Sequence, residues 1–488
     1  MTARNNFTSD THTHTHSHIH THTHTQTITM PLSKDPRICW ETDIFFEIPI
    51  WCIQPDVQKI EKVILPYLEI NGLADPTVTF FAQGALNKLY TIHAIHAEFG
   101  TEHDFVFRVA LPVQPYYKTE SEAATCNYVR LHTSIPAPRI YAYDSSSENE
   151  LGFEWMLMEK IPGTPLAKVW DSMEWERKVY VAMRLAEWMD ELSRCRFTKV
   201  GSLYHSSKAN LGGFEVGPAV DFDFYRGRCL QYELDRGPFS TAQQFYQSSI
   251  LSRRMDVNFY TENVQEDGEG SGEGKASEEK NQKSESEEHE HQDGMEYEKR
   301  AILGIPKACD ALLKILPQVF PEDSPEKTPK VLYHHDISVS NILVDDAGNL
   351  VGLVDWENIL TVPYALARPF PKALECIYGE DDTGMLDKPP PPESEEDDNR
   401  KTYDELYEKT QLQEVFRKRL EELQSPWLRT FTEATLLSKE FIWNLEGINF
   451  TFRRTKEWID RLAGREDLGK TWDYRRMKQT NIEARVYV

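Results

Sequence analysis

The sequence predicts an α+β chain of two lobes, in which a small mixed lobe of β-sheet and helix precedes a larger, mainly helical lobe. Residues 39–158 are rich in strand-like segments and contain one helical stretch, Glu120–His132. Residues 159–165, between the two predicted lobes, include a Pro-Gly turn. Helical periodicity dominates 166–488, as in the apolar stripe of Glu174–Arg194. With 488 residues, 40% of them hydrophobic, the chain is long enough for each lobe to bury a core.

The net charge of -25 is concentrated in two stretches of the chain. Residues 262–298 hold 14 acidic and 3 basic residues, and residues 379–400 hold 9 acidic and 2 basic residues. We expect the first stretch to be a disordered insertion and the second, with its four consecutive prolines, to be an acidic, proline-rich loop. The rest lacks the basic stripe of a nucleic-acid binder, and no apolar run approaches the roughly 18 residues of a membrane span. We therefore expect no nucleic-acid partner and no membrane partner.

Residues 1–38 are predicted to be a disordered tail, because residues 11–27 alternate threonine or serine with histidine and offer little to bury. Neutral imidazoles at this spacing can chelate zinc or nickel, but a repeat without a selected role explains the tract equally well. The histidines are His12, His14, His16, His18, His20, His22 and His24.

The start of the chain and its cysteines both bear on location. The amino terminus lacks the features of a secretory signal and of a transit peptide, which favours a cytoplasmic location. Seven cysteines are odd in number and widely separated, a pattern that favours reduced thiols over a disulfide framework.

The most informative segment is 331–344, in which two apolar strands flank a polar loop that carries Asp336 and Asn341. A further strand, Leu350–Val354, ends at Asp355. Phosphoryl transfer needs a base that orients the acceptor hydroxyl and hard oxygen ligands for magnesium, and these three side chains supply that set. The kinase pattern has this order and spacing. The alternative is a hairpin whose polar residues only satisfy backbone groups in the turn.

Together, the segments 334–341 (HHDISVSN) and 354–357 (VDWE) resemble the HGD loop and the IDWE segment of the aminoglycoside and choline phosphotransferase family. That family has a bilobal, protein-kinase-like fold. The resemblance covers roughly Phe80 to Leu374 without the insertion, and it points to the fungal branch. It implies Asp336 as the catalytic base, His334 as a brace for the loop, and Asn341 and Asp355 as the magnesium ligands.

The resemblance also assigns a phosphate-binding pair in the small lobe. Arg108 lies on the strand Phe105–Leu111, where the family has a lysine, and its planar fork is able to hold phosphate oxygens in a different geometry. Glu122 matches the helix glutamate that pairs with this cation. A solvated strand-edge cation and a surface glutamate are the alternatives.

Two backbone regions complete the expected nucleotide site. Phe80–Tyr90 reads as strand, turn around Gly84 and strand, a hairpin that the family uses to cover nucleotide phosphates, although an ordinary turn fits the pattern as well. Backbone groups near Glu159 and Ile161, in the segment that matches the family's hinge, are expected to hydrogen-bond adenine.

The leading hypothesis is an ATP- and Mg²⁺-dependent phosphotransferase that moves the γ-phosphate to a hydroxyl of a small molecule. A protein kinase is disfavoured, because Asp355 is followed by Trp356-Glu357 and not by Phe-Gly. The alternative is an inactive nucleotide-binding pseudokinase that acts as an interaction module, with the acidic insertions as docking arms. Arg108 and His335, the latter at the family's usual glycine, motivate that alternative.

Overall fold

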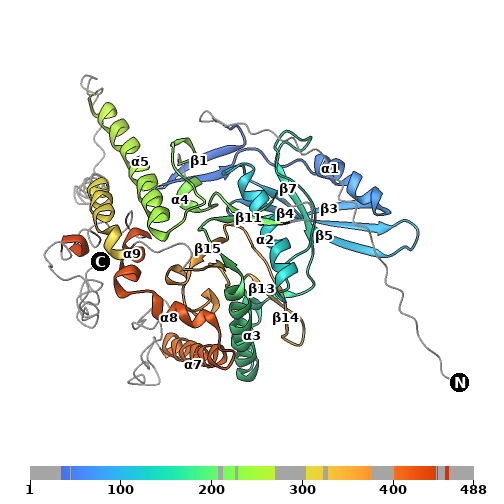
Figure 1. Cartoon of the computed structure of the whole chain (residues 1–488). Helices are drawn as coiled ribbons and strands as arrows, with labels where there is room; N and C mark the ends of the chain where they lie inside the picture. Colours follow the sequence, from blue (N-terminus) through green and yellow to red (C-terminus); the bar gives the residue numbers. More distant parts are fainter. Residues whose placement is uncertain are drawn as a thin grey trace, which may run out of the picture.

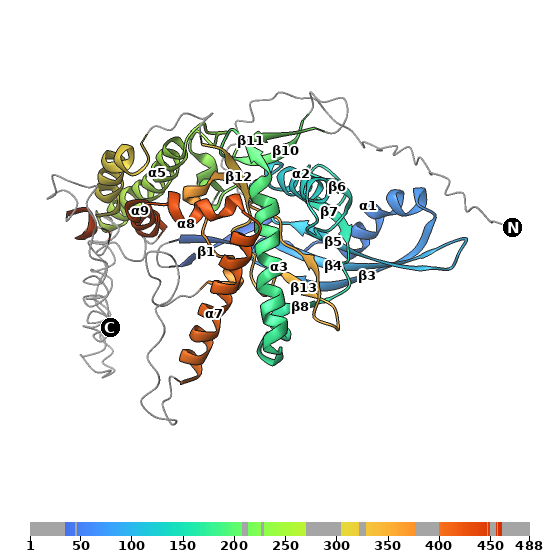
Figure 2. The same cartoon turned by 60° about the horizontal axis from the view of Figure 1, so that its bottom comes forward.

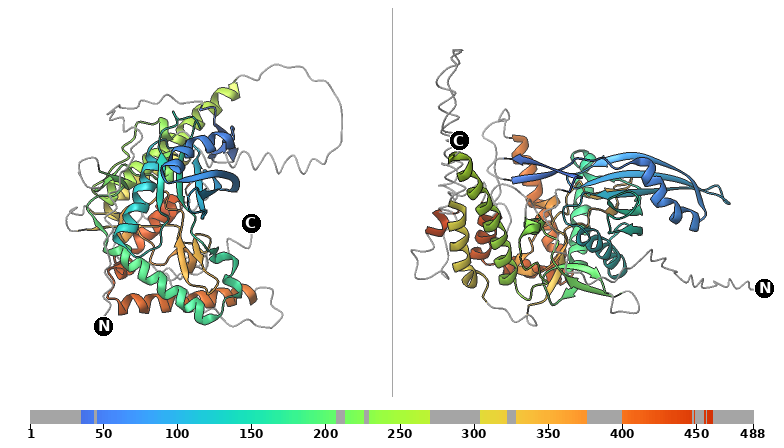
Figure 3. Two further views of the ribbon diagram at one scale, coloured as in Figure 1. Left: turned by 90° about the vertical axis from the view of Figure 1, so that its right-hand side faces the viewer. Right: turned by 90° about the horizontal axis from the view of Figure 1, so that it is seen from above.

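The computed structural model has the two predicted lobes, which lie at opposite ends of the molecule (Figure 1; Figure 3, right). The small lobe is built on a β-sheet and the large lobe is mainly helical, so the predicted α+β class is confirmed. None of the described helices has the length and apolar character of a membrane span. The structure describes residues 35–43, 46–206, 213–225, 229–269, 304–321, 328–375, 400–446, 448, 455 and 457–460.

An antiparallel sheet of five strands forms the core of the small lobe. Its side chains alternate between buried and less buried positions, and Tyr90, Ile92 and Ala94 of the second strand face the core. In spatial order the strands are β3 (Leu73–Gln83), β4 (Asn87–His96), β5 (Glu102–Ala110), β7 (Glu154–Glu159) and β6 (Ile140–Asp144).

Helix α1 (Val57–Ile70) is absent from the predictions. Its N-cap, Asp56, accepts a hydrogen bond from the backbone N–H of Gln58 at 2.9 Å. The residues at every fourth position, such as Ile60 and Ile64, are fully buried. The cap and this spacing are the sequence signals that would have identified the helix.

Helix α2 (Tyr117–His132) confirms the predicted Glu120–His132 helix and begins almost one turn earlier. That early start places Lys118 inside the helix. The side chain of Glu120 accepts hydrogen bonds from Tyr143 of strand β6 and from Ser145, the residue after that strand.

The large lobe packs its helices around one extensive apolar core. Helix α3 (Trp175–Arg194) and helix α7 (Arg400–Glu422) lie side by side (Figure 2) and are joined by the Lys178–Glu408 ion pair at 2.8 Å. The predicted helix Trp427–Leu445 is divided into shorter pieces. The other helices are α4 (Phe222–Tyr225), α5 (Ala242–Glu269), 304–319, α8 (Thr430–Glu433) and α9 (Leu436–Glu446).

Short strands hold the predicted polar loop between two small sheets. Strand β12 (Lys330–Tyr333) enters the loop and pairs with β15 (Leu360–Pro363), while β13 (Ile342–Val344) leaves it and pairs with β14 (Leu350–Leu353). Backbone pairing therefore fixes both ends of the loop, as well as the segment that follows β14. The remaining short strands are β8 (Thr164–Pro165), β9 (Arg196–Phe197), β10 (Ser202–His205) and β11 (Phe214–Gly217).

The structure corrects the prediction of reduced cysteines. Cys39 and Cys52 form a disulfide at the open end of the hairpin of β1 (Ile38–Asp43) and β2 (Phe46–Trp51), with their Cα atoms 5.2 Å apart. The pairing depends on the hairpin register, which the cysteine spacing does not reveal. Cys126, Cys195 and Cys309 are buried free thiols, Cys229 is also buried, and Cys376 lies outside the described residues.

Three predicted segments fall largely outside the described residues. The predicted tail is described only from Asp35 onward, and the loop predicted at 379–400 only at Arg400, where α7 begins. The first residues of the predicted insertion, up to Glu269, continue helix α5, whereas 270–298 lie outside the described residues.

Candidate active site

The loop between β12 and β13 brings Asp336 and Asn341 together. The Asn341 amide Nδ2 donates to the Asp336 carbonyl oxygen at 3.0 Å and to its carboxylate Oδ2 at 3.1 Å. His334 Nδ1 accepts the Asp336 backbone N–H at 3.2 Å, and its ring contacts the edge of Trp356. Burial lowers the pKa of His334 to about 3, so the ring is neutral at physiological pH and able to accept this bond. His334 is thus placed where it can brace the loop.

Asp355 lies beside this loop because β13 and β14 are paired. The Val354 N–H donates to the Asn341 carbonyl at 2.9 Å, directly before Asp355. Asp355 itself has a left-handed backbone, with φ of 67°, which costs a non-glycine residue roughly 1 kcal/mol or more and often occurs at functional sites. Asp355 is exposed as a whole residue, while protein atoms crowd its carboxyl. That crowding and the neighbouring Glu357 carboxylate raise the pKa of Asp355 to about 6.

Arg108 connects the small lobe to the segment after β14. Its side chain is 7% exposed, and its two terminal nitrogens form ion pairs with Glu122 of α2 and with Glu357. Burial alone would lower the pKa of Arg108, but the two carboxylates outweigh it and raise the pKa, so the guanidinium stays charged. The cation and the helix glutamate singled out in the sequence are therefore in contact.

Lys118 is a second buried cation in the same cluster. Its ammonium nitrogen lies 2.7 Å from Glu357 Oε2 and donates to Asn87 Oδ1 at 2.8 Å. Asn87 in turn donates to Glu357 Oε2 at 2.9 Å. Burial alone would raise the pKa of Glu357, but Lys118 and Arg108 outweigh it and bring the pKa down to about 2. Glu357 is therefore a carboxylate shared by two cations and one amide.

The hairpin of β3 and β4 ends beside this cluster. The Gly84 N–H donates to the Asn87 carbonyl at 2.9 Å, so the turn that contains Gly84 leads directly to the Asn87 side chain described above. A Cβ added to Gly84 would meet no other atom closer than 4.0 Å. Packing within the described residues therefore does not require glycine here, and space remains above the turn.

The two hinge positions differ in what their backbones can offer. The Glu159 N–H donates to the Arg139 carbonyl at 2.8 Å, so this donor is not available to an adenine ring. Ile161, two residues later, makes no backbone hydrogen bond of this kind with the described residues, and its side chain lies over Gly352. Of the two positions, Ile161 is the better candidate for adenine.

Lys372 reaches the loop from a turn that the sequence pattern does not single out. Its ammonium nitrogen lies 2.9 Å from Asp336 Oδ1, an ion pair without the alignment of a good hydrogen bond. Burial alone would raise the pKa of Asp336, but Lys372 outweighs it and holds the pKa below the usual value. Asp336 is therefore ionised at neutral pH.

The oxygen donors of Asn341 and Asp355 suit magnesium. Magnesium is usually held by one or two protein ligands while waters and substrate phosphates complete its octahedron. Among the described residues, no three His, Cys, Asp or Glu side chains form a metal site by themselves. The pair thus fits magnesium that arrives with a phosphate better than a closed structural metal site.

Four residues of this site are missing from the sequence predictions: Asn87, Lys118, Glu357 and Lys372. Lys118 stands four positions before Glu122, which places both on one face of a helix, and this spacing was the available signal. Glu357 enters the sequence analysis only as part of the VDWE match. Nothing local to Asn87 or Lys372 indicates a role, since their contacts are distant in sequence.

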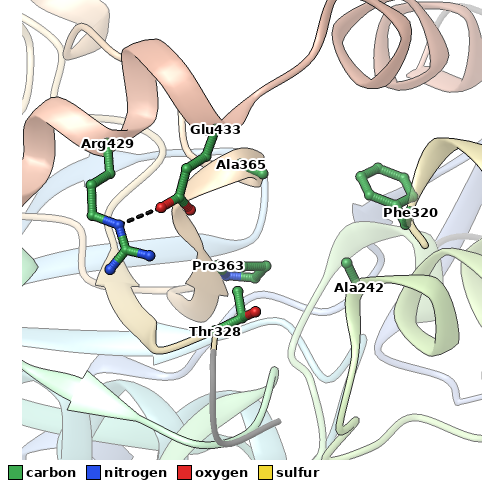
Figure 4. A pocket seen from close by; sticks show the side chains of 7 residues that line it. All are labelled: Ala242, Phe320, Thr328, Pro363, Ala365, Arg429 and Glu433. Atoms are coloured by element: carbon green, nitrogen blue, oxygen red, sulfur yellow. Dashed lines mark hydrogen bonds and ion pairs between the residues drawn. The ribbon is translucent and has the colours of Figure 1, made fainter. Parts of the chain in front are cut away.

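A cavity of about 280 Å³ lies elsewhere in the large lobe (Figure 4). Pro363 lines it, at the end of the β12–β15 pair that is opposite to Tyr333 and the loop. Its two charged residues, Arg429 and Glu433, form an ion pair with each other. The cavity is therefore separate from the candidate active site.

Comparisons with known proteins identify relatives of this chain. The model of a family described as "Phosphotransferase enzyme family" matches residues 77–234 and 262–364, just over half of the chain. A subtelomeric hrmA-associated cluster protein of Aspergillus fumigatus is 29% identical over 33% of this chain and 33% of its own length. Altered inheritance of mitochondria protein 9 of Lachancea thermotolerans is 22% identical over 51% of this chain and 42% of its own length. These matches span less than half of either relative.

Two solved structures show weaker likeness. A macrolide 2'-phosphotransferase of Brachybacterium faecium is 12% identical, with a TM-score of 0.31, over 82% of this chain and 96% of that chain. An ethanolamine kinase of Plasmodium vivax is 12% identical, with a TM-score of 0.27, over 81% of this chain and 87% of that chain.

The comparisons correct the predicted location. Several curated relatives, from Candida tropicalis, Lachancea thermotolerans, Debaryomyces hansenii and Komagataella phaffii, are named as mitochondrial proteins. The prediction of a cytoplasmic location was wrong. It rested only on an amino terminus without the familiar features of a targeting sequence.

Proposed function

Because this chain belongs to the phosphotransferase enzyme family, as its motifs predicted, we propose that it transfers the γ-phosphate of ATP to a hydroxyl of a small molecule, with Mg²⁺. One observation carries the proposal. The Asn341 amide binds the Asp336 carboxylate, while the Asn341 carbonyl accepts the Val354 N–H next to Asp355. The proposed base and the two proposed oxygen ligands thus lie close together, next to two paired strands.

Asp336 is the proposed base. Its carboxylate is ionised at neutral pH and is half-buried at the loop, so it is able to orient an acceptor hydroxyl. As the hydroxyl oxygen forms its bond to the γ-phosphorus, the bond to the departing ADP breaks and the hydroxyl proton passes to Asp336. Asn341 keeps the carboxylate oriented from one side and Lys372 from the other.

Asn341 and Asp355 would hold magnesium through their side-chain oxygens. The ion would neutralise charge on the phosphate oxygens during transfer. Arg108 is held in the site by Glu122 and Glu357, the turn has open space where a side chain on Gly84 would lie, and the backbone of Ile161 has groups to offer to adenine. These are the proposed nucleotide contacts of the small lobe and the hinge.

The test combines binding and turnover in one preparation. Calorimetry would measure Mg²⁺-dependent ATP binding, and ATP hydrolysis would then be followed for wild type, Asp355→Ala and Asp336→Asn. We expect Asp355→Ala to lose Mg²⁺-dependent binding, and Asp336→Asn to keep binding but lose turnover by roughly 10²-fold or more. Loss of turnover would then justify a screen of hydroxylated acceptors, and absence of ATP binding in wild type would refute the proposal.

A second candidate is a pseudokinase that binds nucleotide and acts as an interaction module. The observation that favours it is the position of Arg108, whose terminal nitrogens are both occupied by carboxylates. ATP binding by the wild type without turnover in a broad pool of hydroxylated acceptors would favour this candidate. Turnover that depends on Asp336 would exclude it.

The relatives named as mitochondrial also support a mitochondrial location for this chain. Fractionation of cells that express the protein with a carboxyl-terminal tag would test it. A tag that stays in the cytosolic fraction would contradict a mitochondrial location.

A further inference from the structure

Lys118 is the most deeply buried cation of the candidate active site. It lies in the first turn of α2, and only 2% of the residue is exposed. Its ammonium has three N–H donors, and the contacts within the described residues are Glu357 Oε2 at 2.7 Å and Asn87 Oδ1 at 2.8 Å. Burying a lysine is costly unless its charge is compensated. The burial of this charge among these partners therefore needs an explanation.

Three parts of the fold meet at Lys118, and all three border the proposed phosphate site. Asn87 follows the turn that contains Gly84, Lys118 itself belongs to the helix of Glu122, and Glu357 stands two residues after Asp355. Lys118 thus contacts the residue two positions after the proposed metal ligand and the residue that follows the Gly84 turn.

Arg108 has less freedom to serve phosphates than its charge suggests. Both of its terminal nitrogens are engaged, one by Glu122 and the other by Glu357. A guanidinium is a planar fork with fixed directions, so these two contacts direct one donor of each terminal nitrogen toward a protein carboxylate and limit how the group can turn toward a new acceptor. An ammonium on a flexible stem can instead turn a donor toward a new acceptor while it keeps its others.

We propose that Lys118, from helix α2, supplies the ammonium that binds the nucleotide phosphates, and that Arg108 mainly holds Glu122 and Glu357 in place. Without nucleotide, Glu357 and Asn87 hold Lys118. With nucleotide, a phosphate oxygen joins them as a partner of the ammonium. This inference deepens the proposed function and rests on it.

The test compares ligands that differ only in their phosphates. Calorimetry would measure the affinities of ATP with Mg²⁺, ADP with Mg²⁺ and adenosine for wild type, Lys118→Met and Lys118→Arg. We expect Lys118→Met to weaken ATP binding by roughly 10- to 100-fold, as expected for a hydrogen bond to a charged group, with a smaller loss for ADP. Adenosine affinity should not change, and Lys118→Arg should recover part of the loss.

Lys178→Met is a matched control. Lys178 is also buried, at 6% exposure, and also pairs with a glutamate, Glu408, at 2.8 Å. This pair joins helix α3 to helix α7 and does not belong to the candidate active site. All three affinities should be unchanged in this variant. If Lys118→Met does not fold, the double variant Lys118→Met with Glu357→Gln removes one charge of each sign. Its loss of affinity should likewise grow with the number of phosphates in the ligand.

Two outcomes would overturn the inference. Equal affinity of wild type and Lys118→Met for ATP, or an equal loss for ATP and adenosine, would make Lys118 a structural counter-ion of Glu357. Either result would leave the proposed function intact as long as wild type binds ATP with Mg²⁺. If wild type binds neither ATP nor ADP, the proposed function fails, and this inference fails with it.

Discussion

The ammonium nitrogen of Lys372 lies 2.9 Å from Oδ1 of Asp336, although the two residues belong to different turns of the large lobe. The Ala373 N–H donates to the Ile337 carbonyl at 2.8 Å, which holds the turn of Lys372 against the loop. The Lys372 side chain is 57% exposed, so its end is accessible from the solvent side of the base. Lys372 is therefore placed to orient the Asp336 carboxylate from the solvent side.

Lys372→Gln should reduce turnover and leave nucleotide affinity unchanged. The amide keeps part of the side-chain length but loses the charge that orients Asp336, and we expect a loss of about tenfold in kcat, equivalent to about 1.4 kcal/mol. Steady-state kinetics and ATP calorimetry would measure the two quantities separately. Lys418→Gln, which removes an exposed lysine paired with Glu414 on α7, is the control and should alter neither. Unchanged kcat in Lys372→Gln would contradict the prediction.

Glu357→Gln should destabilise the protein and increase its stabilisation by nucleotide. The substitution removes the carboxylate that Arg108 and Lys118 share, so Glu122 is the buried carboxylate that still pairs with Arg108. Breaking a buried ion pair by removing one partner costs about 3 kcal/mol. Phosphates would restore the missing negative charge. ATP with Mg²⁺ should therefore raise the melting temperature of the variant by more than it raises that of wild type.

Glu408→Gln is the control for that experiment, because it removes the carboxylate partner of another buried lysine, Lys178. It should lower the melting temperature without enlarging the shift caused by ATP. Equal ATP shifts in wild type and Glu357→Gln would show that phosphates do not replace this carboxylate.

Glu154 should make stability depend on pH between about 4.5 and 7. The residue is 2% exposed, its carboxylate accepts the Tyr116 N–H at 2.8 Å, and burial raises its pKa from 4.5 to about 7. In that interval the folded protein binds more protons at Glu154 than the unfolded chain does. The stabilisation by Glu154 is therefore complete below pH 4.5 and is lost as the pH rises through 7.

Glu154→Gln should remove this pH dependence. The amide oxygen still accepts the Tyr116 N–H without an ionisable group, so the free energy of unfolding at pH 8 should exceed that of wild type by up to about 3 kcal/mol. Denaturant unfolding of both proteins from pH 4 to 8 would measure the difference. Parallel stability profiles for the two proteins would refute the assignment of a raised pKa to Glu154.

Trp356→Phe should lower both stability and turnover. The indole Nε1 donates to the Leu353 carbonyl at 2.8 Å, and its ring packs on His334 with centroids 4.8 Å apart. Loss of this hydrogen bond and of packing volume should cost about 1–3 kcal/mol of unfolding free energy. Turnover should fall because His334 then holds the loop less firmly.

The control for that variant is Trp458→Phe. Trp458 is equally buried and donates its Nε1 to Glu440 at 2.9 Å, in the last described part of the chain. It should lose a similar stability and keep full turnover. Equal losses of turnover in the two variants would mean that the effect is general and does not pass through His334.

Local pattern was sufficient for the parts of the site that are contiguous in sequence. The strands around 331–344 and the helix at Glu120–His132 have hydrophobic periods that burial requires, and the fold forms them as predicted. Asp336, Asn341 and Asp355 are joined by a loop and a short pair of strands, so their proximity follows from the backbone alone. Helix α1 was within reach of the same reasoning, through its Asp56 cap and its buried stripe.

By itself, then, the sequence determined the two-lobed α+β fold, the family and the loop that carries the base and metal-ligand candidates. Only the tertiary structure decided which charges meet. Lys118, Asn87 and Glu357 come from a helix, a hairpin and a strand end that are far apart in the chain, and Lys372 joins Asp336 from another turn. Ion pairs of this kind depend on distance and burial in three dimensions, and neither has a local signature in sequence.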